Sequence, residues 1–402
     1  MAEVKPKIQS FARIKVLGIG GSGTSAVNRM SELGIKGVEF IAINTDAQAL
    51  HNNHADIKVH IGKGATKGLG SGMNPELGRQ AAEESIEELE EVVENADMVF
   101  ITCGLGGGTG TGASPIVAEL AKNKGVLTVA LVTKPFTFEG SKRKEVAEAG
   151  YDNLKDKVDA VIAIQNDRIL RIIDKKTSLI DAFKTVDEVL RQGISGISDL
   201  ITTHGLVNAD FADVKAIMQD AGTAMMGIGR ASGETRAAEA ARLAINSPLL
   251  DMSLDGAKGV LFNITGGRDL GMFEIDEAAK VITKNIDPDA KVKFGAVIDE
   301  SLGDEIKITV IATGFDGAGG VPASLSQSFE DSKKGFNMPS FFSSQNPASQ
   351  PSPAMEVRKP LFNPQSAQPK PFSQTPPQAQ TPSKLEEDDE LEIPAFIRKK
   401  MK

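Results

Sequence analysis

Two glycine-rich segments have the composition and spacing of phosphate-binding loops. The first covers residues 18–24 and follows the apolar run 14–17, and the second covers residues 104–112 and follows the apolar run 98–101. Each pattern predicts a strand, a loop without Cβ atoms and the start of a helix. Such a loop presents unpaired backbone N–H groups and the positive end of a helix dipole, which together bind phosphate. Two loops of this kind predict a polyphosphate held from both sides.

The spacing within the first loop leaves more than one ligand class open. Gly18, Gly20 and Gly23 match the G-x-G-x-x-G pattern of dinucleotide-binding folds. Asp46 follows the next expected strand, where such folds hold a ribose hydroxyl, so a nicotinamide oxidoreductase is one alternative. Neither loop contains G-x-x-x-x-G-K-[ST], which excludes a lysine-based P-loop. A dinucleotide fold does not require the second glycine loop, and this disfavours the oxidoreductase.

Two carboxylates three residues apart are candidates for hydrolytic chemistry. Asp210 and Asp213 could orient a water molecule or a hydrated cation beside a phosphate. The same spacing fits a structural role, in which Asp210 is the N-cap and Asp213 the N3 residue of a following helix. The two roles are compatible, and the spacing alone does not choose between them.

Alternating strands and helices are expected to position these groups. Up to about residue 170, apolar runs of strand length alternate with helical stretches such as 81–94 and 115–123. This alternation predicts a mostly parallel sheet covered by helices on both faces, with ligands at the carboxyl ends of the strands. The expected strands are 14–17, 39–43, 98–101, 126–132 and 160–164.

A long helix and a second α/β unit are expected to follow. Apolar residues recur at spacings of three and four from Leu179 to Ile201, which predicts one core helix about 33 Å long at ~1.5 Å per residue. Beyond it, helices are expected near 237–245 and 273–286. The expected strands of this unit are 259–265, 292–298 and 305–313. We expect no second nucleotide site here.

Composition limits the partners and the compartment. The net charge is −9 and there is no basic stripe with interleaved aromatic residues, which argues against nucleic-acid binding. The first residues form no apolar signal region and no stretch is long enough to span a bilayer, so we expect a cytoplasmic chain. The single cysteine, Cys103, ends an apolar strand and is expected to be a small buried residue. His51 and His54 lack cysteine partners, and we expect no metal site built by the protein alone.

The segment after Gly314 differs from the rest of the chain. Twelve of the 19 prolines fall within 317–384, among Ser, Gln and Asn, which predicts a disordered tether. An acidic run at 386–390 follows. The chain then ends in an apolar and basic peptide from Leu391 to Lys400, which is typical of a peptide that binds partner proteins.

Several of these segments resemble the FtsZ family, the tubulin-like GTPases of bacterial cell division. The glycine loop 106–112 resembles the signature of the tubulin superfamily. Motifs that resemble FtsZ more narrowly are residues 44–50, 66–70, 134–140 and 208–213, and the terminal peptide from Leu391 to Lys400. The resemblance covers roughly residues 13–316 and the last dozen residues.

The resemblance implies a tubulin/FtsZ-like α/β fold. Its parts are a Rossmann-like parallel-sheet GTPase domain, a long central helix, a second α/β domain and a disordered C-terminal tail. The implied segments are a flexible N-terminus (1–12), a GTP-binding domain (13–177), a connecting helix (178–203), a domain with the catalytic loop (204–316), a linker (317–384) and a partner-binding peptide (385–402).

The resemblance also implies function. It implies a GTPase that polymerises head to tail into protofilaments and builds the cytokinetic ring at mid-cell, with Mg²⁺ bound alongside GTP or GDP. The terminal peptide would bind division proteins and membrane adaptors, so that contact with the membrane is indirect.

Site residues are implied at the matching positions. Catalysis would use Asp210 and Asp213, with Asn208 beside them. Glu139 and Arg143 would contact the ribose and phosphate side, whereas Asn166, Phe183 and Asp187 would face guanine. The remaining nucleotide-binding residues would be Asn44 and, around the phosphates, Gly20, Gly21, Ser22, Gly23, Thr24, Ser25, Gly104, Gly106, Gly107, Gly108, Thr109 and Gly110.

The sequence departs mildly from the family pattern. Ser22 and Thr24 replace glycines and are expected to add hydroxyl donors. Gln165 stands where proline usually precedes Asn166, and this affects the expected pose of Asn166. Glu392 replaces a frequent aspartate in the terminal peptide, a change that we expect to be tolerated.

The long helix decides where the acids act. If Asp187 contacts guanine, Ile201 lies about 21 Å further along the helix at ~1.5 Å per residue. Asp210 then cannot reach the γ-phosphate of its own GTP and must serve a neighbouring subunit, a contact that propagates as an open filament. A nucleotide-dependent scaffold that polymerises without appreciable turnover stays a second alternative.

Overall fold

The structure, a computed structural model, describes residues 12–315 except 36, 175, 203, 204, 206, 208, 209, 248–253 and 285. These residues all belong to the first of two units, Met1–Lys334. The predicted N-terminal segment up to residue 11, the linker 317–384 and the peptide 385–402 lie outside the described residues. The domain boundaries given above therefore stay predictions.

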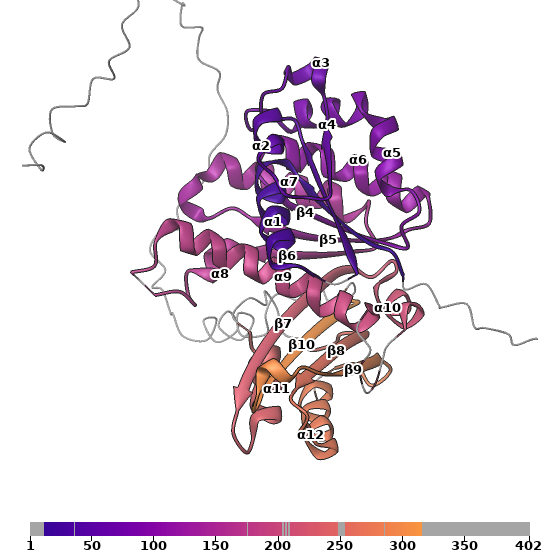
Figure 1. Cartoon of the computed structure of the whole chain (residues 1–402), viewed down its shortest axis with the longest axis vertical. Coiled ribbons are helices and arrows are strands. Elements are labelled where there is room, and N and C mark those ends of the chain that lie inside the picture. Colours follow the sequence, from indigo (N-terminus) through magenta and orange to yellow (C-terminus); the bar gives the residue numbers. More distant parts are fainter. Residues whose placement is uncertain are drawn as a thin grey trace, which may run out of the picture. The chain divides into compact units, whose positions relative to one another are not determined.

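One sheet of ten strands runs through the described residues, in the order β3-β2-β1-β4-β5-β6-β7-β10-β8-β9 (Figure 1). Neighbours from β3 to β7 pair in parallel, whereas β10 pairs antiparallel with both β7 and β8. The strands are β1 (Ile14–Ile19), β2 (Val38–Asn44), β3 (Ile57–His60), β4 (Met98–Gly104), β5 (Leu127–Lys134), β6 (Ala160–Gln165), β7 (Gly222–Ser232), β8 (Gly259–Gly266), β9 (Lys291–Ile298) and β10 (Glu305–Thr313).

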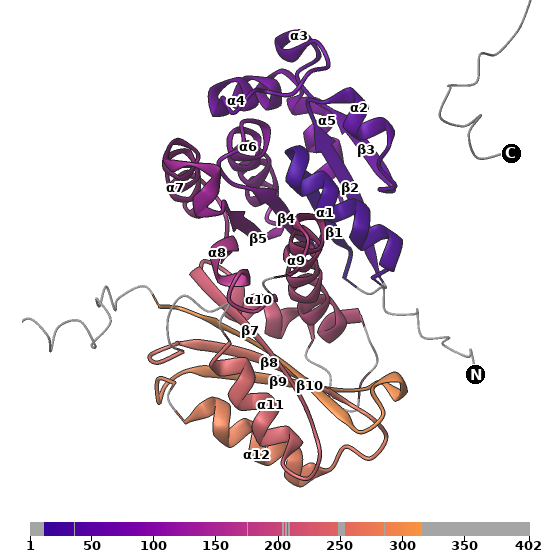
Figure 2. The same cartoon turned by 90° about the vertical axis from the view of Figure 1, so that its left-hand side faces the viewer.

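Helices cover the sheet around three apolar cores. The helices are α1 (Gly20–Leu33), α2 (Ala47–His51), α3 (Lys63–Thr66), α4 (Pro75–Glu84), α5 (Ile86–Val93), α6 (Thr109–Asn123), α7 (Ser141–Lys155), α8 (Asn166–Ile169), α9 (Leu179–Thr202), α10 (Phe211–Met218), α11 (Arg236–Ile245) and α12 (Met272–Thr283). The first core takes residues from α1, α9 and α10, the second from α4 to α7, and the third from α11, α12, β7, β8 and β10. Figure 2 shows α11 and α12 on the same face of the strands β7, β8 and β10.

The central strands of the first half are largely apolar because both of their faces are buried. Successive side chains of a strand point to opposite faces. In β1, Val16 joins the first core and Leu17 the second. A parallel sheet covered on both faces needs such continuous apolar runs, which confirms the fold class predicted from the sequence.

Helix α9 packs against both halves of the sheet, the half from β3 to β6 and the half from β7 to β9 in the strand order above. It has 24 residues and is therefore about 36 Å long at ~1.5 Å per residue. A Cβ on Gly193 would lie 2.6 Å from Leu131 of β5 and 2.9 Å from Met226 of β7. A Cβ on Gly196 would lie 2.7 Å from Thr309 of β10. Small residues thus let α9 pack closely on strands from both halves.

Some predicted elements differ from the observed ones. The expected helix 81–94 is two helices, because the chain turns at Ser85, the C-cap of α4 and the residue before α5. The expected helix 115–123 begins earlier, at Thr109, since the glycine loop itself becomes helical. Strands β3 and β7 were not predicted. No helix among the described residues has the length and apolar character needed to cross a membrane.

Candidate nucleotide-binding site

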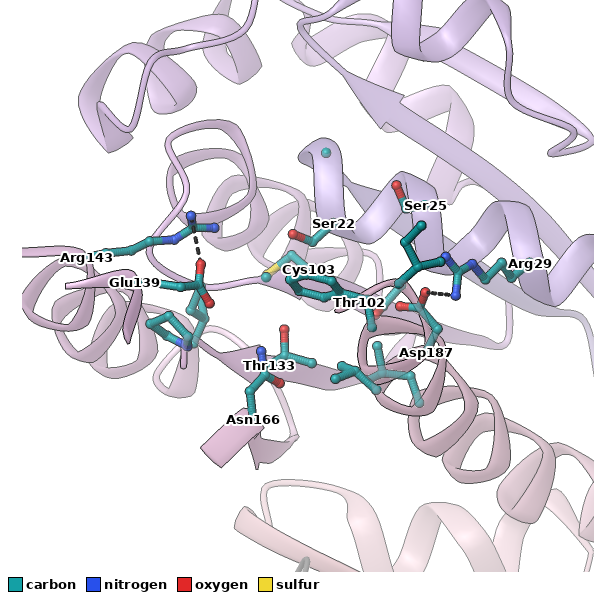
Figure 3. Close-up of a pocket in the computed structure, with 18 residues that line it drawn as sticks. Ser22, Ser25, Arg29, Thr102, Cys103, Thr133, Glu139, Arg143, Asn166 and Asp187 are labelled. Atoms are coloured by element: carbon teal, nitrogen blue, oxygen red, sulfur yellow. Dashed lines mark ion pairs between the residues drawn. The ribbon is translucent and has the colours of Figure 1, made fainter. Parts of the chain in front are cut away.

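A cavity of about 530 Å³ opens at the carboxyl ends of the neighbouring strands β1 and β4, where both glycine loops begin. Figure 3 shows Glu139 and Arg143 on one side of it and Arg29 with Asp187 on the other. The residues around it are Gly21, Ser22, Ser25, Arg29, Thr102, Cys103, Gly104, Leu105, Thr133, Pro135, Glu139, Arg143, Asn166, Ile180, Phe183, Val186, Asp187 and Leu190.

A second hollow of about 250 Å³ continues this cavity along the glycine loops. The two share Gly21, Ser22, Gly104 and Arg143. The hollow is lined further by Ile19, Asn44, Asp46, Ala49, Gly70, Ser71, Gly72, Met73, Gly107, Gly108, Thr109 and Gly110. The larger cavity is lined partly by apolar side chains and the hollow mostly by glycines and small polar residues, as a nucleoside and its phosphates require.

The two loops approach each other so closely that glycine is required at their contact. Gly20 has a φ of +72°, and a Cβ there would lie 2.6 Å from the backbone N of Gly110. A Cβ on Gly104 would lie 2.6 Å from Ser22 Oγ. The wall of the hollow is therefore backbone, and its N–H groups can approach an anion directly.

Four predicted phosphate-loop residues, Gly20, Gly23, Thr24 and Gly106, line neither the cavity nor the hollow. A Cβ on Gly23 would lie 2.3 Å from the Thr102 carbonyl oxygen, so Gly23 packs α1 against β4. The Thr24 hydroxyl donates to the Gly20 carbonyl at 2.9 Å, inside α1. Gly106, at φ +88°, donates its N–H to Thr111 Oγ1 at 2.9 Å. These residues and Gly20 shape the loops, whereas the other predicted nucleotide-binding residues line the cavity or the hollow.

A buried hydroxyl network supports the second loop. Thr109 Oγ1 lies 2.8 Å from Thr45 Oγ1 and 2.8 Å from Ser71 Oγ. Asp46 accepts hydrogen bonds from the N–H groups of Gln48 and Ala49 and so caps α2. The start of α6 is thus fixed to the segments that follow β2 and precede α4.

The nucleoside end combines an aromatic ring with an unusual carboxylate. Phe183 meets Phe136 edge to face, with ring centroids 5.7 Å apart. Asp187 Oδ2 lies 3.1 Å from Arg29 Nη1. Burial raises the pKa of Asp187 to about 6, even though Arg29 acts to lower this pKa. A buried carboxylate is a strong acceptor for N–H donors such as those of guanine.

Buried polar atoms without hydrogen bonds mark the same two spaces. Among the described residues, six buried side-chain atoms lack a hydrogen-bond partner, and five of their residues line the cavity or the hollow. These five are Arg29, Asn44, Thr102, Arg143 and Asn166, of which Arg29 Nη1 already has an ion pair with Asp187. Buried polar groups are normally hydrogen-bonded, so this clustering fits a polar ligand that supplies the missing partners.

Arg143 is held in place by Glu139. The guanidinium lies 2.8 Å from Glu139 Oε2, and Glu139 Oε1 accepts a hydrogen bond from the Phe136 N–H at 2.8 Å. The pair therefore presents a fixed cation where the cavity and the hollow join.

The sequence reasoning missed several lining residues. Arg29 follows Ser25 by four residues on α1, a spacing that places both side chains on one helix face. Thr133 and Pro135 stand at the carboxyl end of β5, the edge where ligands bind such sheets. Both signals were available in the sequence. For Thr102 and Cys103, the sequence contained no signal of a binding role beyond their place at the end of β4.

The two candidate catalytic acids lie at the start of α10. Asp210 is the N-cap and accepts a hydrogen bond from the Asp213 N–H at 2.7 Å, which confirms the predicted capping geometry. Asp213 lies 2.6 Å from Lys293 Nζ, and this hydrogen bond lowers the pKa of the Asp213 carboxyl. Asp210 is exposed. Asn208 lies outside the described residues.

The acids are remote from the cavity. Neither lines the cavity or the hollow. Asp213 pairs with a residue of β9, which is six strands away from β4 in the sheet. The chain that follows α10 also lies at the other end of the parallel strands: the Gly222 N–H donates to the Asp159 carbonyl at 2.9 Å, at the amino end of β6, whereas the cavity lies at the carboxyl ends. A nucleotide bound between the glycine loops is therefore out of reach of the acids of its own chain.

Comparisons with known proteins decide the family. Residues 13–174 match the model of the Tubulin/FtsZ family GTPase domain, and residues 222–316 match that of the FtsZ family C-terminal domain. An FtsZ dimer from M. jannaschii is 46% identical, with a TM-score of 0.74, covering 77% of this chain and 90% of its own. The chain belongs to the FtsZ family.

Further solved structures share the fold. A mutant FtsZ from M. jannaschii is 47% identical, with a TM-score of 0.73, covering 76% of this chain and 92% of its own. GDP-bound CetZ1 from Haloferax volcanii, at 21% identity and a TM-score of 0.66, covers 80% of this chain and all of its own, 100%. At that identity the likeness shows the fold alone.

Membership of the FtsZ family implies that the chain binds a guanine nucleotide. The matched N-terminal domain is a GTPase domain, so the nicotinamide alternative is wrong.

Cys103 is buried, as predicted, and burial raises the pKa of its thiol to about 11. The described residues contain no group of three or more His, Cys, Asp or Glu side chains that could hold a metal ion.

Proposed function

We propose that this protein hydrolyses GTP at a site completed between adjacent subunits of a head-to-tail protofilament. The observation that carries the proposal is the separation between the cavity and the acids. The cavity lies at the carboxyl ends of the parallel strands, whereas Asp210 and Asp213 begin helix α10, which leads to Gly222 at the amino end of β6, and Asp213 pairs with Lys293 of β9. The acids can then act only on the nucleotide of another copy.

Such a contact joins two different surfaces of identical chains. A heterologous contact that does not close into a ring propagates as an open filament. The relatives support this arrangement, since one solved structure is an FtsZ dimer and another, CetZ2 from Haloferax volcanii, is described as a GTPγS-bound protofilament. Assembly and hydrolysis would therefore be coupled.

Each part of the site has a distinct task in this mechanism. The backbone N–H groups of the loops, with Ser22 and Arg143, stabilise the charge of the phosphates. Asn166 and Asp187 offer hydrogen-bond partners to guanine. Asp210 and Asp213 of the neighbour orient the attacking water. Mg²⁺, which prefers phosphate and water oxygens, would arrive with the nucleotide and neutralise developing charge.

The cellular role follows from the family and from the tail. We propose a cytoplasmic protein that forms the ring at the mid-cell division site. The peptide from Leu391 to Lys400 would bind division proteins and membrane adaptors. This part rests on the sequence, because the peptide lies outside the described residues.

A scaffold that polymerises without appreciable turnover is the second candidate. One observation favours it, since both acids already have partners within the chain: Asp210 caps α10 and Asp213 pairs with Lys293. Capping leaves other carboxylate oxygen lone pairs free to accept from water, so it does not exclude catalysis.

The test is light scattering and phosphate release measured together across a protein dilution series, with magnesium and GTP or GDP. We expect scattering only with GTP, and phosphate release that begins at the same protein threshold. Scattering without phosphate release would establish the scaffold. Turnover proportional to protein at the lowest dilutions would contradict the shared site.

A further inference from the structure

Lys293 stands on the exposed half of the edge strand β9. Residues 291–294 of this strand are exposed, and β9 pairs only with β8 among the described strands. Because side chains alternate along a strand, Lys293 shares a sheet face with Gly295. A Cβ on Gly295 would lie 2.3 Å from Leu200 near the end of α9. Lys293 thus projects on the side where the chain leaves α9 and enters α10.

There it meets the candidate catalytic acids. Its Nζ lies 2.6 Å from Asp213 Oδ1, and the Asp213 N–H donates to Asp210 Oδ1 at 2.7 Å. The hydrogen bond with Asp213 and the charge of Asp210 both raise the pKa of Lys293. One ammonium group therefore serves a pair of carboxylates. The ion pair between Lys293 and Asp213 remains accessible to solvent, with side-chain exposures of 49% for Lys293 and 29% for Asp213.

The charges pose a problem for the proposed subunit contact. Two carboxylates must approach the triphosphate of the next subunit, and the chain as a whole carries a net charge of −9. Like charges repel more strongly as a contact closes and water leaves. A cation fixed beside the acids reduces this repulsion. It also keeps Asp213 ionised and restricts its rotamers, and an ionised carboxylate can accept a proton from water or order it.

We propose that Lys293 is a positioning residue of the GTPase site, which orients Asp213 and compensates the charge of the acid pair against the phosphates of the neighbouring subunit. This inference rests on the proposed function. It assigns Lys293 a role in catalysis in trans without any contact to the nucleotide of its own chain.

A simpler explanation for lysine at this place is protection of the sheet edge. Lysines on edge strands prevent unwanted pairing between sheets. Lys291 shares the strand, the face and the exposure of Lys293 and would serve that purpose equally. Lys291 is therefore the matched control.

The experiment compares wild type, Lys293→Gln, Lys293→Arg and Lys291→Gln by scattering and phosphate release in magnesium and GTP at several salt concentrations. We expect Lys293→Gln to raise the assembly threshold and lower turnover per assembled subunit, each by roughly tenfold at low salt, with a smaller effect at high salt. Lys293→Arg should restore most of both values. Lys291→Gln should behave like wild type.

A second measurement separates a positioning role from a structural one. In an Asp213→Asn background, the assembly threshold should respond much less to Lys293→Gln, since the hydrogen-bonded partner charge is gone and only Asp210 remains. An unchanged response there, or equal effects of Lys291→Gln and Lys293→Gln, would overturn the inference. Wild-type turnover without a threshold would instead overturn the proposed function, so the two failures are distinguishable.

Discussion

The nucleotide cavity and the acid surface are built in opposite ways. The cavity is a hollow within a single chain, and beside its phosphate end the two glycine loops approach so closely that Gly20 has no room for a Cβ. The acid surface is two carboxylates at the first turn of the eight-residue helix α10, beside an exposed edge strand. One chain can complete the first by itself, whereas the second becomes a site only when another molecule covers it. If the proposed function holds, we therefore expect mutations to separate GTP binding from hydrolysis.

The largest effect on GTP turnover should come from a substitution in the exposed acid surface. Asp210→Asn keeps an N-cap, because Asn caps helices about as well as Asp, but removes the ionised carboxylate. We expect turnover to fall by roughly a hundredfold or more, with GTP affinity within about twofold of wild type. Phosphate release and fluorescent-nucleotide titration measure the two quantities. Loss of GTP binding in this variant would remove the distinction between the two regions.

For the glycine loops beside the cavity we expect the reverse, a loss of GTP affinity. Gly20→Ala places a Cβ 2.6 Å from Gly110 N and forces the loops apart, so GTP affinity should fall by at least about tenfold. Gly34→Ala is the control, because Gly34 has a similar φ of +69° but open space around its Cβ position. Both variants should lose about 1–2 kcal/mol of unfolding free energy from backbone strain, measured by denaturant titration. Equal GTP affinity in the two would show that the loop contact is irrelevant.

A moderate effect should appear on changing pH. Because burial raises the pKa of Asp187 to about 6, the carboxylate protonates below that pH, and GTP affinity should fall several-fold between pH 7 and 5. The free energy of unfolding should instead rise as the pH falls over this range, whereas GTP affinity falls. The native state holds this proton more tightly than the unfolded chain, so the Asp187 contribution to stability falls as pH rises from about 4 to 6.

The control for this pH effect is Asp187→Asn, which cannot titrate. Its GTP affinity should be lower throughout and flat across the same range, as followed by nucleotide titration in buffers of constant ionic strength. A wild-type affinity that is also flat would mean that Asp187 does not contact the base.

The smallest effect on the two regions should come from the tail. Deletion of 385–402 removes neither the cavity nor the acids, so the assembly threshold and turnover should stay within about twofold of wild type while binding of adaptor proteins is lost. Sedimentation with and without a purified adaptor tests this. Failure of GTP-driven assembly in the truncated chain would contradict the assignment of the peptide to partner binding.

Periodicity identified most of the sheet and the long helix, because buried parallel strands read as continuous apolar runs. Strand β7 was missed since it contains Gly and Ala where a strand usually carries branched residues. The reason is packing, because a Cβ on Gly229 would lie 2.0 Å from the Ala240 carbonyl oxygen of α11. Strand β3 has four residues, two of them exposed, and therefore no clear alternation.

The candidate site was predictable where backbone makes it and less so where side chains meet across the fold. The glycine loops could be predicted from their composition alone. The pairing of Arg29 with Asp187, and that of Lys293 with Asp213, joins residues 158 and 80 positions apart. No local pattern encodes such contacts, which depend on how distant elements pack.

The sheet has one narrow seam. Strands β6 and β7 pair through only three residue pairs, Ala160↔Gly222 to Ile162↔Ala224, whereas β7 and β10 pair through nine. Helix α9 packs across the same junction through Gly193. The two halves are therefore joined at this junction less by backbone pairing than by side-chain packing, because the first apolar core contains Leu131 and Ile162 of one half and Met226 and Ile311 of the other.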